Sequence, residues 1–276
     1  MTVTTDTPRG LIGVIHLRPL PGDPLHDGSG FSEVERAALD DAEALVRGGA
    51  DGLILENFGS APFPKLRVPP HHVATLAILA RECARRFPTA VGVNCLRNDA
   101  RAAIAIAASA GASFVRVNVH VGVYATDQGL IEGDAYRTLR YRAALGASPP
   151  SVHILADVLV KHAAPITPID PHRATEDALD RGLADAVIVT GDATGAPIAR
   201  ATLEAVRAAA RDRPVYLGSG VTPESARELG PLADGAIVGT WLKQGGDVRN
   251  PIDPARVAEL AAVLRDTLRT TSQRSR

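Results

Sequence analysis

The feature that most constrains the fold of this chain is a short pattern that recurs four times. In each copy a residue pair ending in alanine leads into a short run of aliphatic and β-branched residues, at 49–55, 111–117, 183–189 and 232–238. Recurrence at intervals of about 50 to 70 residues indicates a repeated supersecondary unit. Each copy is expected to end one helix and open one strand.

Four further apolar runs lie between these copies, at 11–17, 90–95, 152–160 and 215–217. Near-continuous apolar runs bounded by turn residues are typical of strands buried on both faces of a parallel sheet. The intervening segments have helical spacing and end signals, for example an expected capping box from Ser32 to Glu35. Eight strands alternating with helices predict an α/β fold, a (β/α)8 or TIM barrel, with an open doubly wound sheet as the alternative.

The length of 276 residues fits one such domain, which we place at 10–270 between a flexible leader, 1–9, and a flexible tail, 271–276. Hydrophobic residues make up 45% of the chain, enough for a large core. The leader lacks the apolar segment of a secretory signal, and no apolar run reaches the roughly 18 residues of a membrane span. We therefore expect a soluble, cytoplasmic protein with its two cysteines reduced.

The formal charge of −1, with acidic and basic residues interleaved, leaves no net field to hold a nucleic acid. A small molecule is the expected partner, and a homo-oligomer stays open. In a barrel, ligands meet the loops that follow strands. The longest such loops are expected at 57–70, 120–132 and 161–171, and loops of this length are often lids or binding elements.

The strongest local signal is a pair of glycine-containing turns after the last two predicted strands. Glycines let the backbone approach an anion closely, and the N–H groups of a short helix near 241–243 would point at it. The predicted phosphate-binding residues are Gly218, Ser219, Gly220, Gly239 and Thr240. The alternative is that these glycines only form tight turns.

Polar residues also gather at the predicted strand ends, where they must satisfy one another or face a ligand. They are His16, Glu56, Asn57, Asn94, Asn118, His120, Asp157, Lys161 and His162. Glu56 and Asp157 are candidates for general acid or base, or for fixed ion-pair partners. Lys161 is expected to bind an anion, with a Schiff base as the lesser alternative. We also include His120 among the catalytic candidates.

Arg116 and Asn118 are two apart in a strand and share one face. A buried arginine there needs a carboxylate, which either Glu56 or Asp157 could supply. The predicted substrate-binding residues are His16, Asn94, Arg116, Asn118, Thr190 and Gly191. A turn-rich loop at 191–195 could add sugar contacts or none, and a purely structural polar network is the alternative for the whole group.

No cofactor is predicted, because the sequence lacks the spaced histidine motifs of metal sites. A divalent metal held by His16, Glu56 and His120 remains a lesser possibility.

Nine segments of the chain resemble the BtpA family. The resemblance is carried, in order between Gly10 and Asp253, by the segments 13–17, 51–59, 92–99, 116–120, 126–129, 131–133, 156–163, 189–191 and 218–222. It implies a barrel fold. At Trp241 the resemblance leads us to expect a smaller residue.

The resemblance implies two different functions. The family takes its name from a factor needed to accumulate photosystem I, whereas its SgcQ-like members resemble metabolic barrel proteins. Our leading hypothesis is an isomerase, lyase or hydrolase acting on a phosphorylated sugar or ribosyl compound. The alternative is a non-enzymatic assembly factor for photosystem I or another membrane complex, because one barrel scaffold hosts unrelated functions.

Overall fold

The computed structural model describes residues 7–148, 151–191 and 197–268. Eight parallel strands close into a barrel in the order β1-β2-β3-β4-β7-β9-β10-β11. Their bounds are β1 Gly10–His16, β2 Gly52–Glu56, β3 Ala90–Asn94, β4 Phe114–Val117, β7 His153–Val158, β9 Ala186–Val189, β10 Val215–Leu217 and β11 Gly235–Val238. The predicted TIM barrel is thus confirmed, and the open-sheet alternative is wrong.

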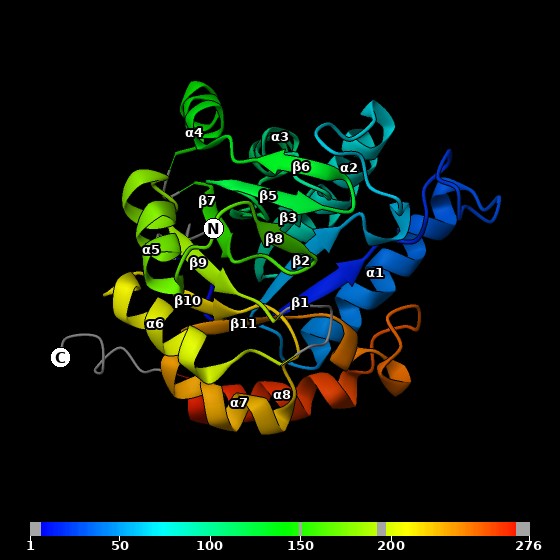
Figure 1. Cartoon of the computed structure of the whole chain (residues 1–276). Helices are drawn as coiled ribbons and strands as arrows, with labels where there is room; N and C mark the ends of the chain where they lie inside the picture. The colour runs from blue at the N-terminus through cyan, green and yellow to red at the C-terminus, as the bar shows by residue number, and fades with distance from the viewer. Residues whose placement is uncertain (1–6, 149–150, 192–196, 269–276) are drawn as a thin grey trace.

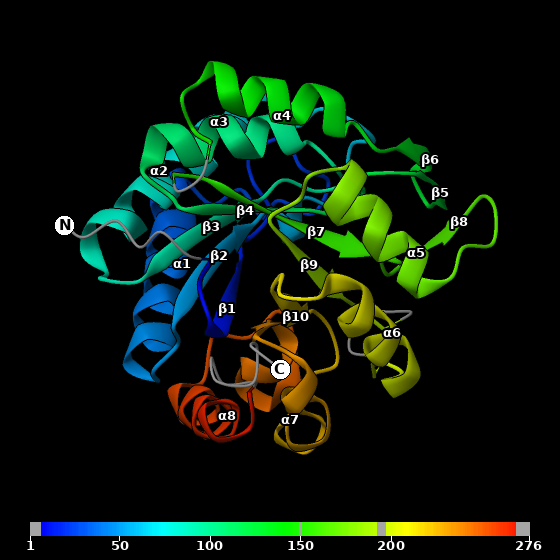
Figure 2. The same ribbon diagram turned by 90° about the vertical axis from the view of Figure 1, so that its left-hand side faces the viewer.

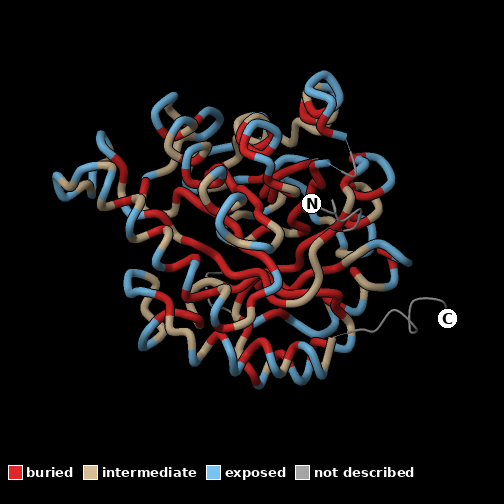
Figure 3. The backbone as a smooth tube through the Cα atoms, turned by 180° about the vertical axis from the view of Figure 1, so that it is seen from behind, coloured by how far each residue is buried: buried red, intermediate tan, exposed pale blue. Residues whose placement is uncertain are grey.

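A helix follows each barrel strand, and the helices form a ring around the barrel (Figure 1). Their bounds are α1 Phe31–Arg47, α2 Pro70–Arg86, α3 Ala100–Ala110, α4 Ala135–Ala144, α5 Pro171–Glu176, α6 Arg200–Ala210, α7 Pro223–Leu229 and α8 Pro254–Thr267. Buried residues concentrate in the central strands and on the inner faces of the helices (Figure 3). No helix in the described ranges is both long enough and apolar enough to cross a bilayer.

Two sequence expectations about local structure are wrong. Helix α1 begins one residue before Ser32, after an N-cap glycine, Gly30, without a side-chain cap, so the expected capping box does not form. A reciprocal capping box starts α7 instead, where Thr222 and Ser225 bond each other's backbone.

The second error concerns the loops expected at 120–132 and 161–171. They form a small antiparallel sheet of β5 Val123–Thr126, β6 Gly129–Glu132 and β8 Ala163–Pro165. Tyr124, Ile131 and Val160 bury a satellite apolar cluster beneath it. Figure 2 shows this sheet at the edge of the molecule, beside the ends of α4 and α5. We name it the crown sheet.

Parts of the predicted leader and tail lie in the described ranges. Thr7 is buried, and the Pro8 carbonyl accepts a hydrogen bond from the Tyr216 hydroxyl. Residues 7–9 therefore contact the barrel, whereas residues 1–6 and 269–276 lie outside the described part of the chain. Cys83 and Cys95 are buried free thiols.

A buried ion pair ties α1 to the segment that follows β11. The Lys243 ammonium donates to Asp41 Oδ2 at 2.6 Å, and Asp41 Oδ1 accepts from the backbone of Ile252 at 2.8 Å. The Lys243 side chain is only 2% exposed. Removal of one partner from such a pair leaves a buried charge without compensation.

We expect Asp41→Asn to lower the free energy of unfolding by about 3–5 kcal/mol, because it strands the Lys243 ammonium. The neighbouring Asp40 pairs with Arg36 on the exposed face of the same helix. Asp40→Asn should therefore change stability by less than about 0.5 kcal/mol. Urea unfolding followed by circular dichroism measures both, and equal effects of the two variants would contradict this role of the Asp41–Lys243 pair.

Candidate functional site

The inner wall of the barrel has an apolar floor. Its members are buried residues on alternating positions of the strands: Ile12, Val14, Ile54, Phe114, Leu155, Ala186, Ile188, Tyr216 and Ile237. Because side chains alternate along a strand, the next inward position lies two residues closer to the C-terminal mouth. These next positions are His16, Glu56, Asn94, Arg116, Asp157, Thr190, Gly218 and Gly239. A ring of mostly polar residues thus lies above the apolar floor, and we call it the mouth layer.

The centre of the mouth layer is a bidentate ion pair. Arg116 donates from Nε to Asp157 Oδ1 and from Nη2 to Asp157 Oδ2, both at 2.9 Å. Asn118 Nδ2 donates to the same Oδ2 at 2.9 Å. The side chain of Asp157 is 0% exposed and lines neither of the cavities described below, whereas Arg116 lines both. Of the two carboxylates considered for Arg116, Asp157 is the partner, and its place favours positioning of Arg116 over direct proton transfer.

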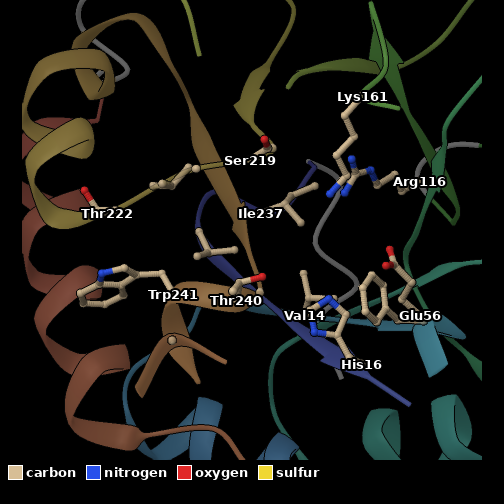
Figure 4. A pocket seen from close by; sticks show the side chains of 17 residues that line it. Val14, His16, Glu56, Arg116, Lys161, Ser219, Thr222, Ile237, Thr240 and Trp241 are labelled. Carbon is tan, nitrogen blue, oxygen red and sulfur yellow. The ribbon is translucent and has the colours of Figure 1, made fainter. Parts of the chain in front are cut away.

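Glu56 lies on the same side of the cavity as Arg116 (Figure 4). Asn94 Nδ2 donates to Glu56 Oε2 at 2.7 Å, and the registers of β1, β2 and β3 place His16, Glu56 and Asn94 side by side. Glu56 lines the cavity and forms no ion pair with any described residue. Its free oxygen is available to a ligand.

His16 is held in its neutral form. Burial, reinforced by the positive charges of Lys243, Lys161 and Arg116, lowers its pKa to about 3. Its ring packs against Phe58 in a tilted arrangement with centroids 4.6 Å apart, and Nδ1 is buried without a hydrogen-bond partner among the described residues. The neutral imidazole can therefore donate or accept a hydrogen bond without a net charge in its resting state.

Lys161 extends into the mouth from the loop after β7. Its backbone N–H donates to Thr190 Oγ1 at 3.0 Å, and this hydrogen bond fixes the backbone of Lys161. Within the described ranges its ammonium makes no ion pair or hydrogen bond, and burial, together with repulsion from Arg116, lowers its pKa. Figure 4 shows Lys161, Arg116 and Glu56 on one side of the cavity. A half-buried ammonium without an ion-pair partner favours the binding of an anionic ligand.

The opposite side of the same cavity is formed by the two glycine turns. The cavity has a volume of about 200 Å³ and is lined there by residues 218–222 and 239–241 (Figure 4). A Cβ at Gly239 would lie 2.4 Å from His16 Cε1, and one at Gly218 would lie 2.3 Å from Ile188 Cγ2. The barrel packing itself therefore requires both glycines. Gly220 has a positive φ of 60°, as a tight turn requires.

A 3₁₀ helix, Thr240–Leu242, follows the second turn. Its first backbone bond runs from the N–H of Leu242 to the carbonyl of Gly239, at 3.1 Å. Thr240 and Trp241, whose N–H groups precede this bond, line the cavity. The Trp241 ring stacks beneath the Arg256 guanidinium, 4.3 Å from its centroid, on the side of the cavity away from Lys161 (Figure 4).

Other predicted site residues lie elsewhere. His120 is buried with Nε2 2.7 Å from the carbonyl of Gly182, and it lines neither cavity. Asn57 bonds both backbone groups of Leu96 and so fastens two loops together. The backbone of Gly191 donates to Ser219 Oγ at 3.2 Å, and the rest of that predicted loop, 192–195, lies outside the described residues.

The lesser metal hypothesis requires His120 to lie beside His16 and Glu56, but His120 lies apart from them. Across residues 7–148, 151–191 and 197–268, no three His, Cys, Asp or Glu residues are grouped to hold a metal ion.

Three of the residues that line the cavities at the mouth were not predicted from the sequence. Phe58 and Phe63 come from the loop after β2, and Arg97 follows β3. The position of Arg97, three residues beyond a strand end, was a usable signal. The two phenylalanines carried none, because an aromatic residue in a loop is more often part of a packed cluster.

Comparison with known proteins places the chain in a family. A model of the BtpA family matches residues 7–266. The photosystem I biogenesis protein BtpA of Synechocystis is 44% identical, over 99% of this chain and 93% of that protein. An uncharacterized protein of Pyrococcus furiosus is 43% identical over 89% and 91% of the two chains. Among solved structures, phosphoribosyl anthranilate isomerase from Thermus thermophilus covers 93% of this chain and 98% of its own, with a TM-score of 0.53 and 15% identity, which shows the shared barrel fold.

The lowered pKa of Lys161 gives a direct test of the mouth. After reductive ¹³C-methylation, the Lys161 signal should titrate below the ordinary pKa range of a lysine, because burial and Arg116 disfavour the charged amine. Saturating inorganic phosphate should move the Lys161 midpoint upward. A Lys161 midpoint within or above the ordinary lysine range without phosphate would contradict the arrangement described here.

Proposed function

The chain belongs to the BtpA family, and we propose that it is an enzyme that binds a small phosphorylated metabolite, of the sugar or ribosyl class, in the barrel mouth. The proposed chemistry is proton transfer, as in an isomerase, lyase or hydrolase. The observation that carries the proposal is the single cavity in which the unpaired Lys161 ammonium and Glu56 face the two glycine turns.

The phosphate is proposed to bind at the glycine turns. Gly218, Ser219 and Gly220 on one turn and Gly239 and Thr240 on the other line the cavity, and the three glycines have only backbone to offer it. Backbone N–H groups at such turns form favourable contacts with an anion at little conformational cost. The Lys161 ammonium supplies the positive charge that neutral N–H groups lack.

Proton transfer is assigned to the other side of the mouth. Glu56 is positioned by Asn94 and has a free oxygen at the cavity, so it is the proposed general base. Neutral His16, next to it in register, is the proposed partner for a hydroxyl or carbonyl oxygen. Arg116, fixed by Asp157, would stabilise negative charge as it develops on the substrate.

The name of the Synechocystis relative favours a second candidate function, in photosystem I biogenesis. Biogenesis describes a requirement in the cell, and an enzyme that supplies a needed compound meets it as well as a scaffold does. A scaffold has no need of an unpaired cation and a free carboxylate converging in one cavity. This is our reason for ranking the enzyme first.

Binding of ribose 5-phosphate, measured by calorimetry and thermal unfolding, tests the proposed phosphate site. Binding to the native state should raise the melting temperature, whereas unphosphorylated ribose should have no effect. Lys161→Gln should weaken binding about ten- to a hundredfold, the worth of one charged hydrogen bond. The matched variant Lys65→Gln, at an exposed position, should bind as the wild type does. A wild-type protein that binds no phosphorylated sugar would favour the assembly role.

Glu56→Gln separates chemistry from binding. The substitution is nearly isosteric and removes only the ionisable group, so ribose 5-phosphate should still bind. Turnover should fall by about 10²- to 10⁴-fold, the usual contribution of a general base. Incubation with a cell extract followed by mass spectrometry identifies phosphorylated compounds that the wild type consumes. Consumption at an unchanged rate by the variant would remove Glu56 from the mechanism.

A further inference from the structure

We propose that the substrate has a second half, a planar ring that carries one hydrogen-bond acceptor and one donor, and that this ring binds in a second cavity beside the phosphate site. The inference rests on the proposed function, because it names the class of phosphorylated compound that the mouth accepts. Heterocyclic lactams and amides attached to a sugar phosphate have this chemistry.

The second cavity adjoins the first. It has a volume of about 370 Å³ and shares four lining residues with the phosphate cavity, namely Glu56, Phe58, Arg116 and Lys161. A ligand that passes between these shared residues therefore reaches both cavities. Its central atoms would lie against Glu56 and Lys161, the groups assigned to chemistry and anion binding.

Asn118 offers an acceptor in this cavity. It is 2% exposed and lines the cavity, and its Nδ2 donates to Asp157 Oδ2. An ionised carboxylate accepts hydrogen bonds only, so the amide cannot be reversed, and the group left over must be Oδ1. That oxygen is buried and has no hydrogen-bond partner in the described part of the chain. A ligand N–H or O–H would satisfy it.

Arg97 offers a donor in the same cavity. It is 5% exposed, its Nη2 donates to the Lys161 carbonyl at 2.7 Å, and its Nε is buried with no partner among residues 7–148, 151–191 and 197–268. A buried donor without a partner is energetically unfavourable. A ligand carbonyl would therefore stabilise the complex and fix the ring by a complementary acceptor and donor pair.

The remaining wall suits a flat apolar group. Phe58 and Phe63 form a tilted pair with ring centroids 6.4 Å apart, and Leu96 and Ala61 complete the lining. Aromatic walls contact ring faces over a large area at low entropic cost.

The charges in the second cavity oppose a second phosphate. The cations Arg97, Arg116 and Lys161 face Glu56 and Asp127 in the same cavity, and Arg116 is already neutralised by Asp157. Burial lowers the pKa of His162, which also lines the wall and so stays neutral near pH 7. A neutral, hydrogen-bonding ring fits this balance better than an anion does.

Calorimetric titration of the full chain tests the inference, with ribose 5-phosphate, the common nucleoside 5′-monophosphates and the matching nucleosides as probes. At least one monophosphate should bind about tenfold or more tightly than ribose 5-phosphate, an increment expected from one aromatic contact with one hydrogen bond. Phe63→Ala should remove this increment and leave binding of ribose 5-phosphate unchanged. Phe87→Ala, at the far end of α2, should retain the increment and serves as the matched control.

The outcomes separate the two proposals. If ribose 5-phosphate binds and no monophosphate binds more tightly, the second half of the substrate is refuted while the phosphate site stands. Retention of the full increment by Phe63→Ala would refute it in the same way. If no phosphorylated probe binds at all, the proposed function fails, and this inference fails with it.

Discussion

The structure depends on one constraint, the cost of placing charge on the inner face of a closed barrel. Strand alternation directs every second residue inward, and the apolar floor blocks solvation from below. A guanidinium in this position is stable only with a carboxylate in direct contact. Arg116 and Asp157, from neighbouring strands β4 and β7, meet this requirement with two parallel hydrogen bonds. The rest of the mouth layer is arranged around this pair.

The mouth layer is asymmetric, and the asymmetry creates the cavity. The barrel strands β1, β2, β3, β4 and β7 contribute polar side chains at this level, whereas Gly218 and Gly239 follow β10 and β11. Each glycine lies against a neighbouring inward side chain so closely that a Cβ would collide with it. The open volume therefore lies on one side of the mouth, with charged groups on the other (Figure 4). This geometry supports separate places for holding a ligand and for acting on it.

Much of this could be predicted from the sequence, because the signals were periodic. Apolar runs of strand length indicated the number of strands, and the polar residues at the ends of these runs identified Glu56, Asp157 and Arg116 as neighbours. Their separate places could not be predicted, since alternation alone does not say which carboxylate pairs with Arg116. His120 was misjudged for a related reason: it follows β4 closely, yet its ring turns to the carbonyl of Gly182. The crown sheet was missed because its strands are short and half exposed, so their hydrophobic pattern is weak.

The crown sheet also determines where the key cation lies. Lys161 stands two residues before β8, whose edge pairs with β5 across Thr126 and Ala163. The lysine thus lies between the barrel, where Thr190 bonds its backbone N–H, and the crown sheet, which begins two residues later. Insertions or deletions in the β5–β6 hairpin would shift the amine while the barrel remains intact. Changes in the β5–β6 hairpin can thus alter ligand preference among family members without changing the stability of the barrel core.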